Sequence, residues 1–399
     1  MSGPVETLGV RRRAAFYLPG YDPRRPAVYH AHLTGELAKA AGLRGFSAQA
    51  GALEEEDGPL PGFDVAAAGE GWEAHTRVTL LRWDDVARPV FRENVLPRAP
   101  RLLGVGLDLL RRGVLARVAR FDKQFAAFVA YPYVATLALL ALLLLAGLGA
   151  GALAASLAGS VLAGLLAGLA AAALAGWLAL RLERPLYLRY LLEDWLFSFA
   201  HERGKTDLLA DRLDVFADAL VAAARDPEID EILIVGHSSG AFLAPETLAR
   251  ALARDPDLGR RGPVVSLLTV GTVAPLMLAD EQAFRYREAL ARLADEPEIV
   301  WHEVQSRHDA MNACPVDPAA VSGLFAMRPR WPKLMRLAMT QLARPGQLGF
   351  FRERLFFFRI HFRFIAANER AHWYDFYGAL TGPLTLAARH AAVPDMRDG

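Results

Sequence analysis

The sequence predicts an α/β fold in which a mostly parallel β-sheet is flanked by helices and interrupted by two transmembrane helices. Two observations lead to this prediction. Short apolar segments alternate with amphipathic segments in both halves of the chain, as strands and helices alternate in parallel sheets. Between the halves, residues 124–180 form a run of 57 positions without any Asp, Glu, Lys, Arg or His.

Composition narrows the class of protein. A chain of 399 residues can bury a full core, and its 45 Lys and Arg residues nearly balance its 44 Asp and Glu residues. No overall positive field favours nucleic acid, so we expect no nucleic-acid partner. The single cysteine, Cys314, excludes an internal disulfide. Residues 1–13 hold three consecutive arginines with no apolar run behind them, so we expect no secretory signal there.

The first half of the chain begins with a predicted strand. Residues 14–18 are apolar and end at Pro19-Gly20-Tyr21-Asp22-Pro23, which is typical of a buried strand that runs into a tight loop. Residues 27–42 then predict a helix. Residues 51–72 include an acidic run and predict a solvated loop, and residues 76–82 predict a second strand.

The uncharged run predicts two transmembrane helices, near residues 133–154 and 158–180. One span needs about 20 apolar residues, so the run is too long for one helix and fits two helices with a short turn. Ala, Leu and Gly occupy every face of both segments, which argues against two buried helices of a soluble core.

Small residues recur at helical spacing in both predicted spans. Gly147 and Gly151 in the first span, and Gly164 and Gly168 in the second, follow the small-xxx-small pattern that lets helices approach closely. A general bias toward Ala and Gly explains the same pattern equally well.

Basic residues flank the run on both sides and predict its orientation. Lys and Arg are enriched on the cytoplasmic side of spans, so both flanks should be cytoplasmic and only the turn near residues 154–160 should cross. We therefore expect an integral protein of the inner or plasma membrane with two spans. The flanking residues are Arg111, Arg112, Arg117, Arg120 and Lys123 before the run, and Arg181, Arg184 and Arg189 after it.

The second half of the chain continues the alternation. Residues 184–200 are aromatic and basic, as expected of a segment at a membrane interface. Residues 207–224 predict an amphipathic helix. Further strands are predicted at residues 232–235, 264–270, 299–304 and, with less regular sequence, 333–339.

A G-x-S-x-G motif, Gly236-His-Ser238-Ser-Gly240, follows the apolar segment 232–235 and precedes a segment compatible with a helix. A serine on a sharp strand-to-helix turn requires glycine two residues before and after it, because larger side chains would clash. The turn raises the hydroxyl from the end of the sheet and directs the N-terminus of the helix at developing negative charge. We predict that Ser238 is a catalytic nucleophile.

With this motif and this order of elements, the chain resembles the α/β-hydrolase superfamily, particularly its lipase and esterase branch. The resemblance covers most of residues 14–390 apart from the uncharged insertion. It implies an α/β-hydrolase fold in two sections, residues 1–90 and 201–399, separated by a membrane insertion at residues 91–200. Because both sections must join one sheet, the number of spans between them must be even, which two satisfies.

The resemblance also implies the order nucleophile, acid, histidine along the chain. The acid is expected just after the second strand beyond the nucleophile, and we predict that it is Asp309. Asp317 is the alternative, although its place before a proline suits a turn residue. A loop carboxylate paired with Arg307 or His308 would explain Asp309 without catalysis.

Three histidines lie late enough in the chain to complete a triad. His361 is followed by Phe-Arg-Phe, similar to the H-x-x-aromatic pattern after the catalytic histidine of several lipase-like families, and we predict His361. His372, followed by Trp-Tyr-Asp, is the alternative, and His390 is the third candidate. A histidine on a basic, membrane-facing helix would explain either of the first two without catalysis.

The oxyanion hole is predicted from position. In the resemblance, one donor is the N–H after the nucleophile, here Ser239, and the other lies in the loop after the first strand, here Gly20 and Tyr21. The usual His-Gly start of that loop is replaced by Pro19-Gly20, so position alone assigns the second donor.

These residues together predict a membrane-anchored serine hydrolase that cleaves carboxylic esters through an acyl-enzyme, with a cytoplasmic catalytic domain. A site near the bilayer makes lipid or other apolar acyl esters the expected substrates. Neither metal-ligand spacing nor a phosphate-binding G-x-x-x-x-G-K-[ST] motif occurs, so we expect no metal and no cofactor. The alternative is a catalytically inactive hydrolase fold that serves as a membrane scaffold or ligand sensor.

Overall fold

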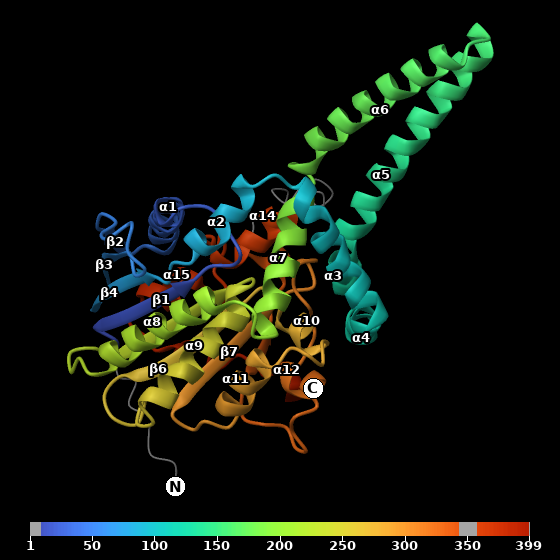
Figure 1. Cartoon of the computed structure of the whole chain (residues 1–399). Coiled ribbons are helices and arrows are strands. Elements are labelled where there is room, and N and C mark those ends of the chain that lie inside the picture. Colours follow the sequence, from blue (N-terminus) through green and yellow to red (C-terminus); the bar gives the residue numbers. More distant parts are fainter. Residues whose placement is uncertain (1–8, 343–356, 399) are drawn as a thin grey trace.

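The computed structural model of the chain describes residues 9–342 and 357–398 and contains a mixed eight-stranded sheet flanked by helices (Figure 1). The strand order is β2-β3-β4-β1-β5-β6-β7-β8. Neighbouring strands from β4 to β8 pair in parallel, whereas β3 pairs antiparallel with both β2 and β4. The strands are β1 (Arg12–Leu18), β2 (Ser47–Ala50), β3 (Gly62–Gly69), β4 (Trp72–Leu80), β5 (Glu231–His237), β6 (Val264–Val270), β7 (Ile299–Gln305) and β8 (Lys333–Arg336).

Helices cover both faces of this sheet, and one helix pair projects away from it (Figure 1). The α-helices of the described residues are α1 (Pro26–Arg44), α2 (Asp84–Arg92), α3 (Ala99–Arg111), α4 (Val114–Phe121), α5 (Lys123–Ala158), α6 (Val161–Glu183), α7 (Leu188–Glu202), α8 (Asp207–Ala224), α9 (Gly240–Arg254), α10 (Ala274–Leu278), α11 (Arg285–Leu293), α12 (Pro318–Ser322), α14 (Phe357–His361), α15 (Phe376–Thr381) and α16 (Leu386–Arg389).

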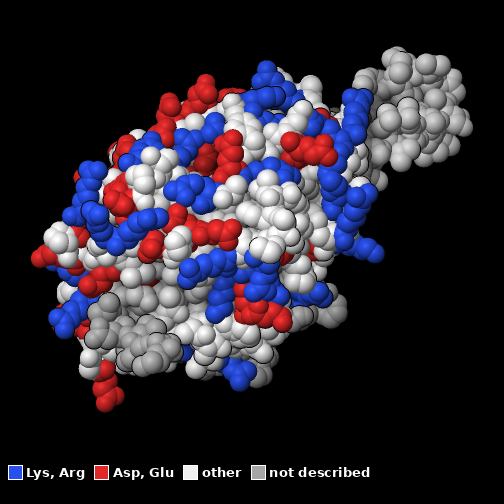
Figure 2. Space-filling view, turned by 90° about the horizontal axis from the view of Figure 1, so that it is seen from below, with Lys and Arg blue, Asp and Glu red and all other residues white. Residues whose placement is uncertain are grey.

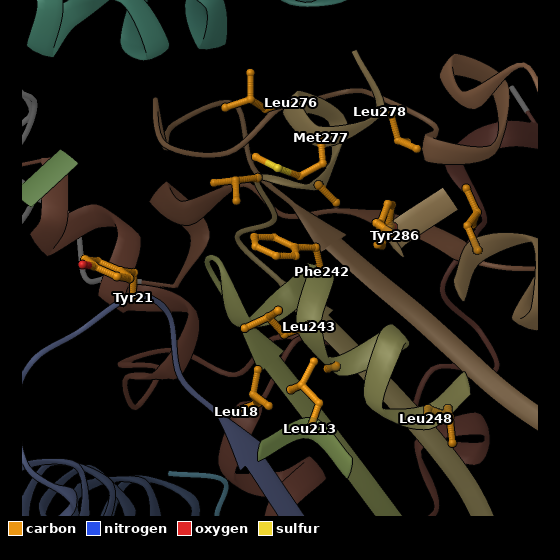
Figure 3. Close-up of a cluster of buried hydrophobic side chains, with 14 of the residues drawn as sticks. Leu18, Tyr21, Leu213, Phe242, Leu243, Leu248, Leu276, Met277, Leu278 and Tyr286 are labelled. Atoms are coloured by element: carbon orange, nitrogen blue, oxygen red, sulfur yellow. The ribbon is translucent and has the colours of Figure 1, made fainter. Parts of the chain in front are cut away.

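Strand residues alternate between two buried cores, as the two-residue period of a strand requires. Phe16 of β1 and Ile234 of β5 face one core, which they share with α7, α8, α9 and α11. Their sequence neighbours Tyr17 and Val235 face the other core, together with α1 and α15. Figure 3 shows part of the first core, where Phe242 of α9 lies between buried aliphatic side chains of α9 and α10. The central strands are therefore apolar on both faces, which explains their continuous apolar sequence.

One predicted loop is a strand. The prediction that residues 51–72 form a solvated loop was wrong, because Gly62–Gly69 forms β3. Phe63, Val65 and Ala67 of this strand are buried, and the residues between them are exposed. The alternation relies on small residues, so it produces a weak pattern in the sequence, and the preceding acidic run obscures it further. The short edge strand β2 was also not predicted.

Helices α5 and α6 are both long and apolar enough to cross a membrane. The first turns of α5, through Tyr133, are buried against the body, and exposed large side chains begin at Val134. The predicted segment 133–154 lies within α5, whereas the predicted segment 158–180 overlaps α6 but starts three residues too early, because α5 runs to Ala158 and α6 begins at Val161. The first helix starts ten residues earlier than predicted because its base belongs to the core of the body.

The glycines of the two small-xxx-small spacings, Gly147, Gly151, Gly164 and Gly168, lie at the contact between α5 and α6. An added Cβ at Gly164 would lie 2.8 Å from the carbonyl oxygen of Gly151. An added Cβ at Gly168 would lie 2.9 Å from the carbonyl oxygen of Gly147. The small-xxx-small spacings therefore permit the close approach of these two helices.

Helix α7 corrects a further prediction. Residues 184–200 were expected at a membrane interface, but Leu191, Trp195 and Phe199 of α7 are each at most 1 % exposed in the core of the body. Aromatic and basic composition is common to interfacial segments and to core helices whose charged side chains are paired, so composition did not separate the two. Helices α3 and α4 also contribute buried residues, and within residues 91–200 the α5–α6 pair alone stands apart.

Candidate active site

Ser238 lies on the turn between β5 and α9, at the carboxyl end of a central strand. Its backbone has a φ of +60°, a left-handed conformation that residues other than glycine seldom adopt. The Ser238 N–H donates to the carbonyl oxygen of Val270 at 3.1 Å, and the Ala241 N–H donates to the Ser238 carbonyl at 2.9 Å. The turn therefore holds a half-buried hydroxyl above the end of the sheet.

The two glycines of the motif are required by close backbone contacts. A Cβ at Gly236 would lie 2.5 Å from the carbonyl oxygen of Gly240. A Cβ at Gly240 would overlap the carbonyl oxygen of Leu18 in β1. The clash that the motif predicts is therefore present at both positions.

The loop after β1 lies directly against Ser238. A Cβ added to Gly20 would come within 2.8 Å of the Ser238 Cβ and 3.1 Å of its Oγ. The Tyr21 carbonyl accepts a hydrogen bond from the Tyr190 hydroxyl, and the Tyr21 ring contacts Trp83 with ring centroids 5.8 Å apart. Figure 3 shows Tyr21 beyond the end of β1. The loop that carries Gly20 and Tyr21 therefore lies against the turn that carries Ser238 and Ser239, and Gly20 makes the close approach to the hydroxyl.

Asp309 and His361 form a buried pair. The His361 Nδ1–H donates to Asp309 Oδ2 at 2.7 Å, and each residue is 1 % exposed. The other carboxylate oxygen of Asp309 accepts the Met311 N–H at 2.9 Å, which orients the carboxylate. Asp309 follows β7 and His361 ends α14, 52 residues apart in the chain. A carboxylate at Nδ1 leaves Nε2 as the basic nitrogen of a neutral imidazole.

The His361 ring lies beside the Ser238 turn. A Cβ at Gly271, the residue after the acceptor of the Ser238 N–H, would lie 2.9 Å from His361 Cε1. The His237 ring stacks on His361 at a centroid distance of 4.6 Å, and its Nε2–H donates to the His361 carbonyl at 3.2 Å. Burial holds the pKa of His237 well below its usual range, so His237 stays neutral. His361 Nε2 is buried and has no hydrogen-bond partner within residues 9–342 and 357–398.

The alternative residues lie elsewhere. The His372 ring shares a hydrogen bond of 3.0 Å between its Nε2 and Gln341 Oε1, and His390 shares one of 3.0 Å between its Nδ1 and that of His302. Asp317 caps α12 by accepting the Ala319 N–H at 2.8 Å, as its position before a proline suggested. The structure pairs none of them with Asp309 or His361.

One residue of the site was missed from the sequence. Asp194 of α7 accepts a hydrogen bond from the Ser239 hydroxyl, which lies 3.0 and 3.1 Å from its two oxygens, and another from Ser198 at 3.0 Å. Asp194 is 4 % exposed, and burial raises its pKa to about 7 against the opposing effects of both serines and of His361. An acidic residue among the apolar Leu191 and Trp195 of one helix was the available signal for a buried carboxyl group.

Replacing Asp194 with Asn should change how the stability of the protein depends on pH. The pKa of Asp194 is about 7 in the folded protein and about 4 in the unfolded chain. The free energy of unfolding of the wild type therefore falls as the pH rises through this interval. Asn has no charge to desolvate and can still accept from Ser239. We expect the melting temperature of Asp194→Asn, relative to wild type, to be several degrees higher at pH 8 than at pH 5.

Asp214→Asn is the matched control for this measurement. Asp214 is paired with Arg250 and Arg254, and hydrogen bonds from these arginines hold its pKa below its usual value against the opposing effect of burial. Both its folded and unfolded pKa values therefore lie below 5, so its difference from wild type should be the same at both pH values. An Asp194→Asn difference that is equally constant would contradict a buried, readily protonated carboxyl group.

In the described part of the chain, no group of three or more His, Cys, Asp or Glu side chains is arranged so that it could hold a metal ion.

Comparisons with known proteins assign no family to the chain. No family model matches it, and neither does any curated protein or solved structure. The interpretation of the site therefore rests on its residues and their geometry.

Proposed function

We propose that this chain is a serine hydrolase of the α/β-hydrolase type that cleaves carboxylic esters and is anchored in a membrane by α5 and α6. The observation that carries the proposal is the arrangement of Ser238, on a positive-φ turn, beside the buried His361–Asp309 pair. The order nucleophile, acid, histidine and the succession β1, α1, β4, α8, β5 both support it. The strands on each side of the insertion join one sheet, as the resemblance to this superfamily requires.

The mechanism follows from the position of each group. His361 Nε2 takes the Ser238 proton as the oxygen attacks the ester carbonyl, and Asp309 stabilises the resulting imidazolium. The N–H groups of Ser239 and of the Gly20–Tyr21 loop stabilise the tetrahedral oxyanion. The imidazolium then protonates the departing alcohol, and water, deprotonated by the same histidine, releases the acid from the serine.

A fluorophosphonate probe tests this proposal directly, because it reacts only with an activated serine. We expect the purified protein to be labelled at Ser238, as located by peptide mass mapping, and to release acid and alcohol from apolar esters. Absence of labelling in the folded protein would instead support an inactive hydrolase fold that acts as a membrane scaffold or ligand sensor.

The membrane part of the proposal predicts the location of both termini. Basic residues flank the helix pair on both sides, and Arg181 near the end of α6 stacks over the Trp177 ring at 4.8 Å. A reporter placed after Gly399 and one placed before Met1 should both be cytoplasmic, whereas a reporter inserted near Ala155 should be translocated. Termini on opposite sides would mean an odd number of spans, which a single sheet built from both sections does not allow.

A further inference from the structure

An apolar groove of about 320 Å³ lies where α5 leaves the body. Helices α3 and α4 form one side of it and the base of α5 forms the other. A Cβ at Gly106 of α3 would overlap the Tyr133 ring of α5, so this glycine lets the two helices meet at the floor of the groove. Its walls include Leu103, Leu107 and Leu110 of α3, Leu115 of α4, and Val134 and Leu137 of α5.

The walls of this groove are exposed. Leu110 and Val134 are each 63 % exposed, and Leu107 and Leu137 are about half exposed. Large apolar side chains gathered in one concave surface mark a binding site for an apolar ligand or a membrane. Val134 and Leu137 belong to the same helix that forms the first apolar segment, so the groove is continuous with the surface that would face lipid.

Basic side chains are carried by the three helices that form the groove. Arg101, Arg111, Arg120 and Lys123 are exposed, and within the described residues none of them forms an ion pair. The local carboxylates are already used, because Asp108 pairs with Arg112 and Arg203, and Asp122 caps α5. Figure 2 shows basic side chains gathered at the right-hand edge of its view, the side on which α3 and α4 lie in Figure 1.

We propose that this groove binds an acyl chain of an anionic phospholipid, with the headgroup held by exposed arginines of α3 and α4 and by Lys123 of α5. The proposal rests on the membrane anchorage of α5 and α6. An apolar groove alone would accept any lipid, and the unpaired cations select a negative headgroup. Helices α5 and α6 would then anchor the protein, and the bound lipid would in addition hold the body against the membrane surface.

The groove is connected to the loop that carries Asp309. Asp122, at the corner between α4 and α5, caps α5 and also accepts the Cys314 N–H at 2.9 Å. The first turn of α5 contacts the same loop through Gln124, whose side chain donates to the Arg307 carbonyl at 3.4 Å. A lipid that orders the base of α5 would therefore act on a segment bonded to both sides of the catalytic acid.

Photocrosslinking in lipid nanodiscs tests the proposal with the full-length protein. Two probes carry the same diazirine acyl chain, one on phosphatidylglycerol and one on phosphatidylcholine. We expect the phosphatidylglycerol probe to label peptides of α3, α4 and the base of α5 at least tenfold more than the phosphatidylcholine probe does. Leu107→Glu with Leu110→Glu should remove this labelling, and Arg101→Gln, Arg111→Gln and Arg120→Gln together should make the two probes equivalent.

Matched controls separate local from general effects. Leu208→Glu replaces an equally exposed leucine of α8, and Arg225→Gln replaces an exposed arginine of the body, and neither should change the labelling. Tryptophan fluorescence melting verifies the fold of each variant. Equal labelling of α3 by both probes in the wild type, or labelling confined to the spans, would overturn the proposal. Fluorophosphonate reactivity is scored separately, so failure of the hydrolase assignment would leave the lipid result interpretable.

Discussion

Ser238→Ala should abolish both ester hydrolysis and fluorophosphonate labelling. In the proposed mechanism the Ser238 oxygen attacks the carbonyl, and the substitution removes it, so we expect turnover to fall by at least about three orders of magnitude. The side chain is half-buried and lies on a backbone conformation that Ala and Ser adopt equally poorly, so the melting temperature should change by no more than a few degrees. Hydrolysis of a chromogenic ester, probe labelling and thermal melting in one detergent measure the three effects.

Ser239→Ala is the matched control for that variant. It deletes a neighbouring hydroxyl, which donates to Asp194, but keeps the backbone N–H that is predicted to bind the oxyanion. We expect it to retain probe labelling and to lose about tenfold or less in rate. Undiminished labelling of Ser238→Ala would show that another residue reacts and that the nucleophile is wrongly assigned.

His361→Ala should reduce turnover by roughly three orders of magnitude or more. A catalytic histidine acts with the nucleophile as a unit, so its loss costs nearly as much rate as the loss of the serine. The structure gives a specific reason for choosing it, because His361 is the histidine that pairs with Asp309 at 2.7 Å and keeps Nε2 unbonded in the described residues. Steady-state hydrolysis of a soluble ester measures the effect.

His372→Ala and His390→Ala are the controls and should stay within about tenfold of wild type. His372 contacts Gln341, and His390 contacts His302, so neither loss removes a group from Ser238. Because His390 is buried, its variant should lose stability rather than rate. If His372→Ala were inactive and His361→Ala active, the catalytic histidine would be His372 instead of His361. The fold and the assignment of Ser238 would not change.

Local patterns in the sequence were enough to predict most of the sheet. Short apolar runs with no charged residue, such as 232–235 and 264–270, are typical of strands that are buried on both faces of a parallel sheet, and both runs form such strands. The strand Gly62–Gly69 lacks that signal, because one of its faces is exposed and the strand is built mostly from small residues. Its place in the sheet depends on pairing with β4, which is a tertiary contact.

The same division applies to the site. Gly236, Ser238 and Gly240 form a local motif because one tight turn imposes all three residue types, so the sequence alone could identify this turn between strand and helix. The approach of Gly20 to Ser238 and the pairing of His361 with Asp309 join residues 218 and 52 positions apart, and no local pattern encodes such distances.

The sequence by itself determined the α/β class, the sharp turn that carries Ser238 and the two long apolar helices, because each follows from the chemistry of residues that are adjacent in the chain. Only the tertiary structure decided which histidine meets Asp309, that α7 is buried in the body rather than lying at a membrane interface, and that Asp194 accepts the hydrogen bond of Ser239. The physical reason is burial. Whether a polar side chain faces solvent or another side chain depends on what packs over it, and distant segments of the chain supply that cover.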